Sequence, residues 1–328
     1  MNRRRALGVA LASLLASAAA RAQPKGKVRR IGVLLGTSRT RPNIERLLMP
    51  FDQALRELGY VEGRNLLIEW REAHGDIARL AGLAAELVAS KVELIVAGTG
   101  AAALAASKVT AEIPIVFVTF GDPVSAGLVK SLARPGGNVT GFSNLSDALT
   151  HKQLELLREV LTRPSTLAVI HSPGDAADIA QLAAMREASA ALGLTTSLHR
   201  VASEADLEGA FRAIAHERPE AMQVFLTVTT YLHRKRIAEF AAAQRIPAVY
   251  AYVEYVEAGG LMSYGFSYAD NWRRTAAYVD KILRGAKPSG LPVQQPQTLE
   301  LAVNLKAAEA LGLAIPQSVL LRANEVIR

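Results

Sequence analysis

Residues 94–118 read LIVAGTGAAALAASKVTAEIPIVFV, two short apolar runs separated by a longer segment of mixed character. The runs Leu94–Ala97 and Ile115–Val118 lack polar alternation, which is typical of parallel strands buried on both faces. Between them, Ala101–Val109 has the apolar spacing of an amphipathic helix. The stretch therefore predicts a strand, a crossover helix and a second strand parallel to the first.

The same alternation extends in both directions along the chain. The order of strands and helices predicts an α/β fold of two doubly wound parallel-sheet lobes, separated by a break at Arg134–Asn138. Further strands are expected at Ile31–Leu35, Asn65–Trp70, Leu167–His171, Thr195–His199, Met222–Val228 and Ala248–Ala251. Further helices are expected at Ile44–Leu58, Ile77–Ser90, Val124–Leu132, Ala177–Leu192, Glu204–Glu217, Tyr231–Gln244, Asn271–Arg284 and Leu305–Leu311.

The N-terminus has the pattern of an export signal. Three arginines (MNRRR) precede the uncharged run Ala6–Ala20 and the small-residue site Ala20-Arg21-Ala22. This pattern predicts a signal peptide, residues 1–22, cleaved after Ala22. The run is short and rich in Ala and Ser for a spanning helix. We expect a periplasmic protein, with the general secretion and twin-arginine routes both open.

Composition excludes several classes of protein. The 328 residues contain no cysteine, which excludes disulfide scaffolds, Cys-ligated metal sites, thiol nucleophiles and a lipidated Cys anchor. The predicted signal peptide contains four arginines and no acid, so its removal lowers the formal charge from +8 to +4. The remaining charges are mixed, and nucleic-acid binding is not expected.

Two α/β lobes in an exported protein favour a ligand site between them, at the carboxyl ends of the strands. Gly98-Thr99-Gly100 follows one such strand and opens a helix. The turn is compatible with a dinucleotide fingerprint, with Asp122 as its acid. It is also compatible with an anion site in which the Thr99 hydroxyl and the N–H groups around Gly100 bind a carboxylate. We favour the anion site.

Polar residues also follow the next strand. Thr119 and Asp122 lie at its end, where Asp122 is expected either to cap the following helix or to pair with a ligand ammonium group. Ser143 and Asn144 lie where the chain passes between the lobes. All four are candidate ligand contacts.

Aromatic residues crowd into the segment from Tyr250 to Trp272. The crowding is compatible with a local core. Tyr252 and Glu254, which follow one strand, and Tyr264, which follows another, are also candidate ligand contacts, because a flat ligand can stack there.

Enzyme signatures are missing from the sequence. The six histidines show no metal-ligand spacing, and neither a nucleophile elbow nor a P-loop is present. We expect no enzymatic activity, no cofactor and no metal. The alternative is a secreted α/β enzyme or nucleotide-binding domain that uses the Gly98-Thr99-Gly100 turn.

Over residues 29–328 the chain resembles the ABC-transporter substrate-binding proteins of the tryptophan/tyrosine-binding type. The matching blocks are Gly121–Val129, Leu132–Gly141, Lys152–Leu157, Gly259–Gly265, Leu291–Val293, Asn304–Lys306, Ala310–Leu313 and Ile315-Pro316. The resemblance implies a type I periplasmic-binding fold with three crossings between the lobes. The first lobe would comprise 29–143 plus 267–286, and the second 144–266 plus 287–328.

We therefore expect a monomeric receptor that captures a small solute and presents it to an ABC permease in the inner membrane. The resemblance implies an amino acid or a related aromatic acid as the solute. Thr99 and the adjacent N–H groups would bind its carboxylate, Asp122 its ammonium group, and Tyr252 or Tyr264 its side chain.

Overall fold

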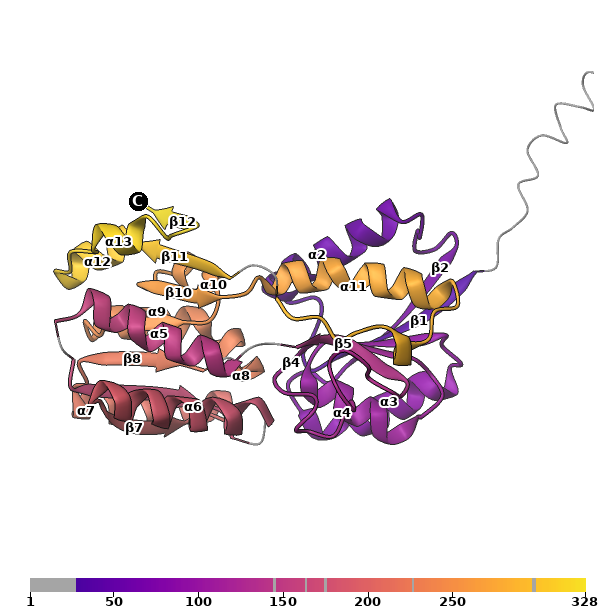
Figure 1. The fold of residues 1–328 in the computed structure, drawn as a ribbon, viewed down its shortest axis with the longest axis horizontal. Helices are drawn as coiled ribbons and strands as arrows, with labels where there is room; N and C mark the ends of the chain where they lie inside the picture. The colour runs from indigo at the N-terminus through magenta and orange to yellow at the C-terminus, as the bar shows by residue number, and fades with distance from the viewer. Residues whose placement is uncertain (1–27, 144–145, 163, 174–175, 226, 297–298) are drawn as a thin grey trace, which may run out of the picture.

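Two α/β lobes lie side by side, each built on its own sheet (Figure 1). The computed structural model describes residues 28–143, 146–162, 164–173, 176–225, 227–296 and 299–328. The predicted fold class, two parallel-sheet α/β lobes, is confirmed. No helix in these ranges is both long and apolar enough to cross a membrane.

The sheet of the first lobe is parallel throughout, with the strand order β2-β1-β3-β4-β5. Its strands are β1 (Arg29–Leu35), β2 (Leu66–Glu72), β3 (Leu94–Ala97), β4 (Ile115–Phe120) and β5 (Val139–Ser143). Its helices are α2 (Pro42–Glu57), α3 (Leu80–Ala89), α4 (Gly100–Val109) and α11 (Tyr268–Leu283), with a short 3-10 turn, η1 (Ile77–Arg79).

Successive side chains of β1 show why this sheet needs helices on both faces. Ile31, Val33 and Leu35 belong to one apolar cluster with residues of α2 and α11, whereas Leu34 belongs to another with residues of α3 and α4. In Figure 1 these two pairs of helices lie on opposite sides of the sheet. Both faces of β1 are buried, which is why its sequence is apolar without alternation.

The sheet of the second lobe has the order β12-β11-β10-β9-β8-β6-β7, and only β10 and β11 pair antiparallel. Its strands are β6 (Thr166–His171), β7 (Thr195–Arg200), β8 (Ala221–Val224), β9 (Ala248–Tyr250), β10 (Met262–Gly265), β11 (Glu300–Asn304) and β12 (Glu325–Ile327). Its helices are α5 (Ser146–Val160), α6 (Ala176–Leu192), α7 (Glu204–Glu217), α8 (Val228–Leu232), α9 (Arg234–Ala243), α10 (Val253–Glu257), α12 (Leu305–Leu311) and α13 (Gln317–Leu320).

The segment between α11 and β11, with its 3-10 turn η2 (Pro288–Gly290), stays with the first lobe over most of its length. Thr140 donates its hydroxyl hydrogen to the carbonyl of Leu291 at 2.8 Å. Gln294 donates its N–H to Gly141 at 2.9 Å and accepts from the N–H of Ser143 at 2.8 Å. The expected boundary at residue 287 therefore needs correction, because these bonds attach residues 291–294 to β5.

The predicted helix Val124–Leu132 is wrong, because turns occupy this segment. Asp122 accepts the N–H groups of Val124 and Ser125, and Gly127 then takes a left-handed backbone with φ +69°. A left-handed residue interrupts a right-handed helix.

Two other elements also differ from the prediction. The strand expected at Met222–Val228 ends at Val224, and Thr227 begins α8 by accepting the N–H of Thr230. The single helix expected over Tyr231–Gln244 is divided at His233 into α8 and α9.

Candidate functional site

The two lobes meet through a row of aromatic rings near the carboxyl end of β3. Tyr268, the first residue of α11, donates its hydroxyl hydrogen to the carbonyl of Gly98 at 2.6 Å. The ring of Tyr252, from the second lobe, stacks on Tyr268 with centroids 5.8 Å apart and planes 6° apart. The structure thus brings Tyr252 into the neighbourhood of the Gly98-Thr99-Gly100 turn.

Thr99 begins α4 as its N-cap. Its backbone is extended, and its hydroxyl accepts the N–H of Ala102 at 3.3 Å. The first N–H groups of a helix have no partner inside it, so those of Gly100 and Ala101 remain available to an anion. The structure thus shows Thr99 as a helix cap, and carboxylate binding by this turn stays a prediction.

Thr37, which the sequence analysis missed, follows the end of the neighbouring strand β1. Leu34 of β1 pairs with Ala97 of β3, so Thr37 and Gly100 each come three residues after a paired position, at the same end of the sheet. Thr37 is only 7% exposed, and its Oγ1 has no hydrogen-bond partner within the described residues. A buried hydroxyl without a partner is costly unless a ligand pairs with it. The rule that selected Thr99, a polar residue just after a buried strand, also selects Thr37.

Asp122 is exposed and hydrogen-bonded within its own turn. Its carboxylate accepts the N–H of Val124 at 2.9 Å, the N–H of Ser125 at 3.1 Å and the hydroxyl of Ser125. The Ser125 hydroxyl is the largest of the causes that lower the pKa of Asp122, and the two N–H groups add to it. These bonds resemble those of a helix cap, but the helix that Asp122 was predicted to cap is absent, and pairing with a ligand ammonium group stays a prediction.

Ser143 and Thr119 belong to the strands that flank this turn. The hydroxyl of Ser143, which is 4% exposed, donates to the carbonyl of Gly121 at 2.8 Å and so ties the end of β5 to the end of β4. Thr119 is half-buried near the end of β4. Asn144 lies outside the described residues.

Tyr252 caps the start of α10 and is packed among other rings. It is 3% exposed, with Tyr231 and Phe266 edge-on to it at 5.7 and 5.3 Å and Tyr268 stacked on one face. Its ring is part of a local core, one of the two roles that the sequence left open. A ligand that reached this cluster would meet aromatic edges rather than one free ring.

Tyr264 lies inside β10 rather than after it, which corrects the expectation that it follows a strand. Its carbonyl accepts the side-chain amide of Gln153 at 2.7 Å, and its ring is half-buried between two apolar clusters. These contacts join β10 to α5.

Glu254 is a half-buried carboxylate in the first turn of α10. Burial is the main cause that raises its pKa, and the charge of Glu257 adds to it. Arg234 and Arg46 lower it through their charge, and neither makes an ion pair with Glu254 in the described part of the chain. A carboxylate in this condition is suited to accept a cationic group from a ligand.

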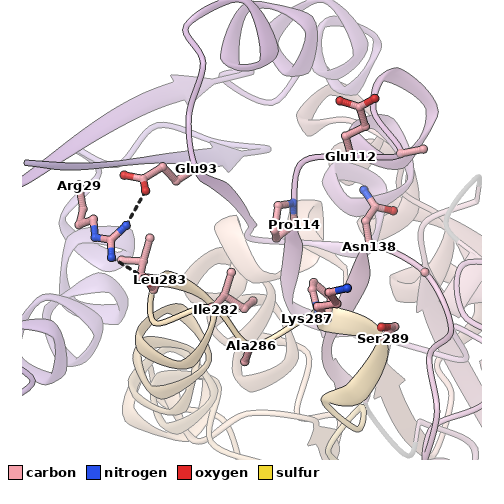
Figure 2. A pocket seen from close by; sticks show the side chains of 14 residues that line it. Arg29, Glu93, Glu112, Pro114, Asn138, Ile282, Leu283, Ala286, Lys287 and Ser289 are labelled. Carbon is pink, nitrogen blue, oxygen red and sulfur yellow. Dashed lines mark hydrogen bonds and ion pairs between the residues drawn. The ribbon is translucent and has the colours of Figure 1, made fainter. Parts of the chain in front are cut away.

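A separate cavity of about 550 Å³ lies at the opposite end of the first sheet (Figure 2). Its guanidinium, Arg29, is already engaged by Glu93 at 2.7 Å and by the carbonyl of Leu283 at 2.6 Å. The amide of Asn138 donates to two backbone carbonyls, those of Thr110 and Ile113. This cavity lies at the amino ends of the strands, so it is not the site predicted from the strand ends.

Comparison with known proteins supplies the remaining evidence. A sequence model of the family described as ABC transporter substrate binding protein matches residues 41–327. The tyrosine-binding protein of Clostridioides difficile (strain R20291) is 25% identical over 275 residues, which cover 83% of this chain and 78% of that protein.

Several solved structures are similar to the chain in both fold and sequence, and two of them are described by their ligand state. An ABC domain from Streptococcus pneumonia in complex with L-Trp gives a TM-score of 0.83 at 27% identity, covering 91% of this chain and 99% of that one. The ligand-free, open structure of a substrate-binding protein with adhesive properties from Clostridium difficile gives a TM-score of 0.66 at 26% identity. The match covers 92% of this chain and 99% of that one.

Proposed function

The chain belongs to the family of ABC transporter substrate-binding proteins, and from this premise we propose that it is a periplasmic receptor for an α-amino acid or a related aromatic acid. It captures the solute between its lobes and delivers it to an ABC permease in the inner membrane. The observation that carries the choice of solute is the unpartnered, buried hydroxyl of Thr37, which follows β1 at the end of the sheet where the neighbouring strand β3 leads into α4.

The carboxylate of the solute is bound at the strand ends of the first lobe. The hydroxyl of Thr37 donates one hydrogen bond, and the N–H groups at Gly100 and Ala101 donate others. The positive end of the α4 dipole favours a negative group in the same place. Thr99 contributes by holding the start of α4 in position, because its hydroxyl already accepts from Ala102.

The ammonium group is assigned to Glu254 rather than to Asp122. The carboxylate of Asp122 is occupied by three hydrogen bonds of its own turn, whereas Glu254 is partly desolvated and lacks a cationic partner among the described residues. Pairing a desolvated carboxylate with an ammonium group yields a stronger bond than the same pair in water. An acid without an ammonium group would use only the first-lobe contacts.

The aromatic part of the solute is expected to contact the ring cluster of Tyr231, Tyr252 and Tyr268. Ring edges carry positive charge and ring faces negative charge, so a further ring adds favourably in an edge-to-face arrangement. A micromolar dissociation constant corresponds to about −8 kcal/mol. A few charge-assisted hydrogen bonds, worth about 1.5–3 kcal/mol each, and one packed ring are of this order.

The arrangement of the lobes supports a capture mechanism. The structure aligns better with the L-Trp complex than with the open, ligand-free relative, at almost the same identity and coverage. We infer that the lobes stand near their ligand-bound angle, with the Tyr252 and Tyr268 rings in contact across the site. Closure over a bound solute would bring these groups together.

The proposal is tested by calorimetry with L-Trp, L-Tyr, L-Leu and benzoate. We expect binding of at least one amino acid, weakened about tenfold by Thr37→Val, which removes the donor hydroxyl at constant shape. Thr196→Val, on the edge strand β7, is the matched control and should leave affinity unchanged. Absence of binding by all four compounds would remove the amino-acid assignment, and equal losses in both variants would remove Thr37 from the site.

A further inference from the structure

A second cavity lies at the hinge, outside the proposed solute site. It has a volume of about 660 Å³ and is lined by residues of α2, the start of α11 and the segment that leads into β11. Phe266 and Ser267 of its wall belong to the crossing from β10 to α11, and Pro296 belongs to the crossing toward β11. Two of the three connections between the lobes therefore border this hinge pocket.

The hinge pocket contains a buried hydrogen-bond donor without a partner. Asn271, the fourth residue of α11, lines the pocket and is 2% exposed. Its side-chain nitrogen has no hydrogen-bond partner among the residues that the structure describes. A buried amide N–H without an acceptor is costly, and an acceptor that reached it from the pocket would relieve that cost.

The same pocket contains a carboxylate, that of Glu300, which forms no ion pair within the described part of the chain. Glu300, the first residue of β11, is half-buried, and burial together with the charges of Asp270 and Glu325 raises its pKa. The arginines that line the pocket are engaged elsewhere. Arg273 binds Asp270, with its Nη2 at 2.6 Å from Oδ1, and Arg274 binds the side chain of Gln294 and lies over the ring of Phe142.

We propose that the hinge pocket is a second binding site, which takes a small zwitterion of the amino-acid class. The ammonium group of the ligand pairs with Glu300, and its carboxylate accepts the free N–H of Asn271. Neither group serves the proposed solute site, so the hinge pocket stands independently of the carboxylate contacts at Thr37. The pocket volume leaves room for a side chain beside Phe266 and Pro296.

Occupancy of the hinge pocket is coupled to closure of the lobes. The crossings that border it change their mutual angle when lobes rotate about a hinge. A ligand that fits one angle better therefore shifts the equilibrium between open and closed forms, and affinity at the solute site changes with it. The coupling is reciprocal, so solute binding changes affinity at the hinge by the same factor.

Calorimetry of the full chain with glycine, L-Trp and L-Glu distinguishes the hinge pocket from the solute site, because each site has its own variant that should weaken binding. We expect a binding event that Glu300→Gln weakens about tenfold or more, as loss of a charge-assisted hydrogen bond does, and that Thr37→Val spares. Glu300→Asp keeps the charge and should recover part of the affinity. Glu325→Gln is the matched control, because it removes a neighbouring charge that does not line the pocket, and it should not weaken binding.

A side-chain amide signal of Asn271 in ¹H–¹⁵N spectra gives a second readout. It should shift on titration with the amino acid that binds, also in the Thr37→Val variant. A single binding event that Thr37→Val weakens and Glu300→Gln spares would overturn the hinge site while supporting the solute site. Absence of binding by all three amino acids in the wild type, or an Asn271 signal that stays in place at saturation, would overturn it as well.

Discussion

The guanidinium of Arg46 and the carboxylate of Glu257 form a two-point ion pair between the lobes, with N–O distances of 3.1 and 3.2 Å. Arg46 lies on α2 of the first lobe and Glu257 at the end of α10 in the second. The Glu257 carboxylate raises the pKa of Arg46, while 69% of the Arg46 side chain stays exposed. The pair therefore holds the lobes together in a place that salt can reach.

Arg46→Ala is expected to weaken solute binding by about two- to fivefold, because an exposed ion pair is worth about 0.2–1 kcal/mol and exists only with the lobes together. The difference from wild type should shrink at high ionic strength. Calorimetry at low and high salt measures it. Lys235→Ala breaks a pair with Glu239 inside α9 and is the control. An equal effect of both variants would show that Arg46 acts only on lobe stability.

Glu254 gives the proposed solute site an acid limit. Because the pKa of Glu254 is raised above its ordinary value, the carboxylate becomes neutral at a higher pH than an exposed Glu. The affinity for a zwitterion should fall as pH decreases through that raised pKa, whereas Glu254→Gln should bind weakly at every pH. Calorimetry between about pH 4 and 8 compares the affinities of the wild type and of Glu254→Gln, with Glu239→Gln as the control. A wild-type profile that stays flat would contradict the assignment.

Glu254 has the opposite effect on the empty protein. A raised folded-state pKa contributes stability that is present below the unfolded-state pKa and is lost as pH rises through the raised value. Glu254→Gln should therefore increase the melting temperature of the ligand-free protein at pH 7 while it decreases affinity. A loss of both stability and affinity would indicate a structural role instead.

Asp122→Ala should cost about 1 kcal/mol of unfolding free energy, comparable to the loss of a helix cap, because its carboxylate accepts two N–H groups of its own turn, and it should spare the affinity for an amino acid. Because the pKa of Asp122 is lowered, its contribution is present above the unfolded-state pKa and is lost as pH falls through the lowered value. Urea unfolding at pH 7 and calorimetry test both parts, with Glu112→Ala as an exposed control. A tenfold loss of affinity at unchanged stability would show that Asp122, rather than Glu254, binds the ammonium group of the solute.

Gly141→Ala should destabilise the first lobe by more than about 3 kcal/mol, in the range seen for backbone strain and overpacking combined. Gly141 has φ +154°, and an added Cβ would lie 2.1 Å from the carbonyl of Phe117. Movement of β5 away from Phe117 is opposed by the backbone hydrogen bonds that Gln294 makes to Gly141 and Ser143. Urea unfolding measures the loss. Gly137→Ala, where nothing lies within 4 Å, is the control and should change little.

The strands β1, β3, β4 and β6 were predictable from local sequence, because each is an uninterrupted apolar run that needs cover on both faces. The strand β5, Val139–Ser143, was missed because Thr140 and Gly141 interrupt its pattern. Its place in the sheet depends on pairing with β4 and on the close approach that Gly141 allows. Such pairings between distant residues leave no periodic signal.

The candidate site was predictable in outline and less so in its roles. The sequence indicated the strand ends and thus the Thr99 turn, but it did not show that the Asp122 carboxylate already accepts hydrogen bonds from Val124 and Ser125 of its own turn. The crowding of aromatic residues around Tyr252 was visible in the sequence. That the rings of Tyr231 and Tyr268 cover Tyr252 was not. Burial of individual atoms, on which the case for Thr37 rests, is a property of the folded chain alone.

The packing of α11 against α2 has a consequence for the order in which the protein acquires its structure. More than two hundred residues separate Tyr60 from Asp280, yet the Tyr60 hydroxyl donates to the Asp280 carboxylate at 3.0 Å. During synthesis the N-terminal half emerges without the helix that covers one face of its sheet. Contacts between residues so far apart slow folding and leave apolar surface exposed while they form. A chain interrupted before α11 should therefore bind holding chaperones and resist native assembly, although all five strands of its first sheet are already present.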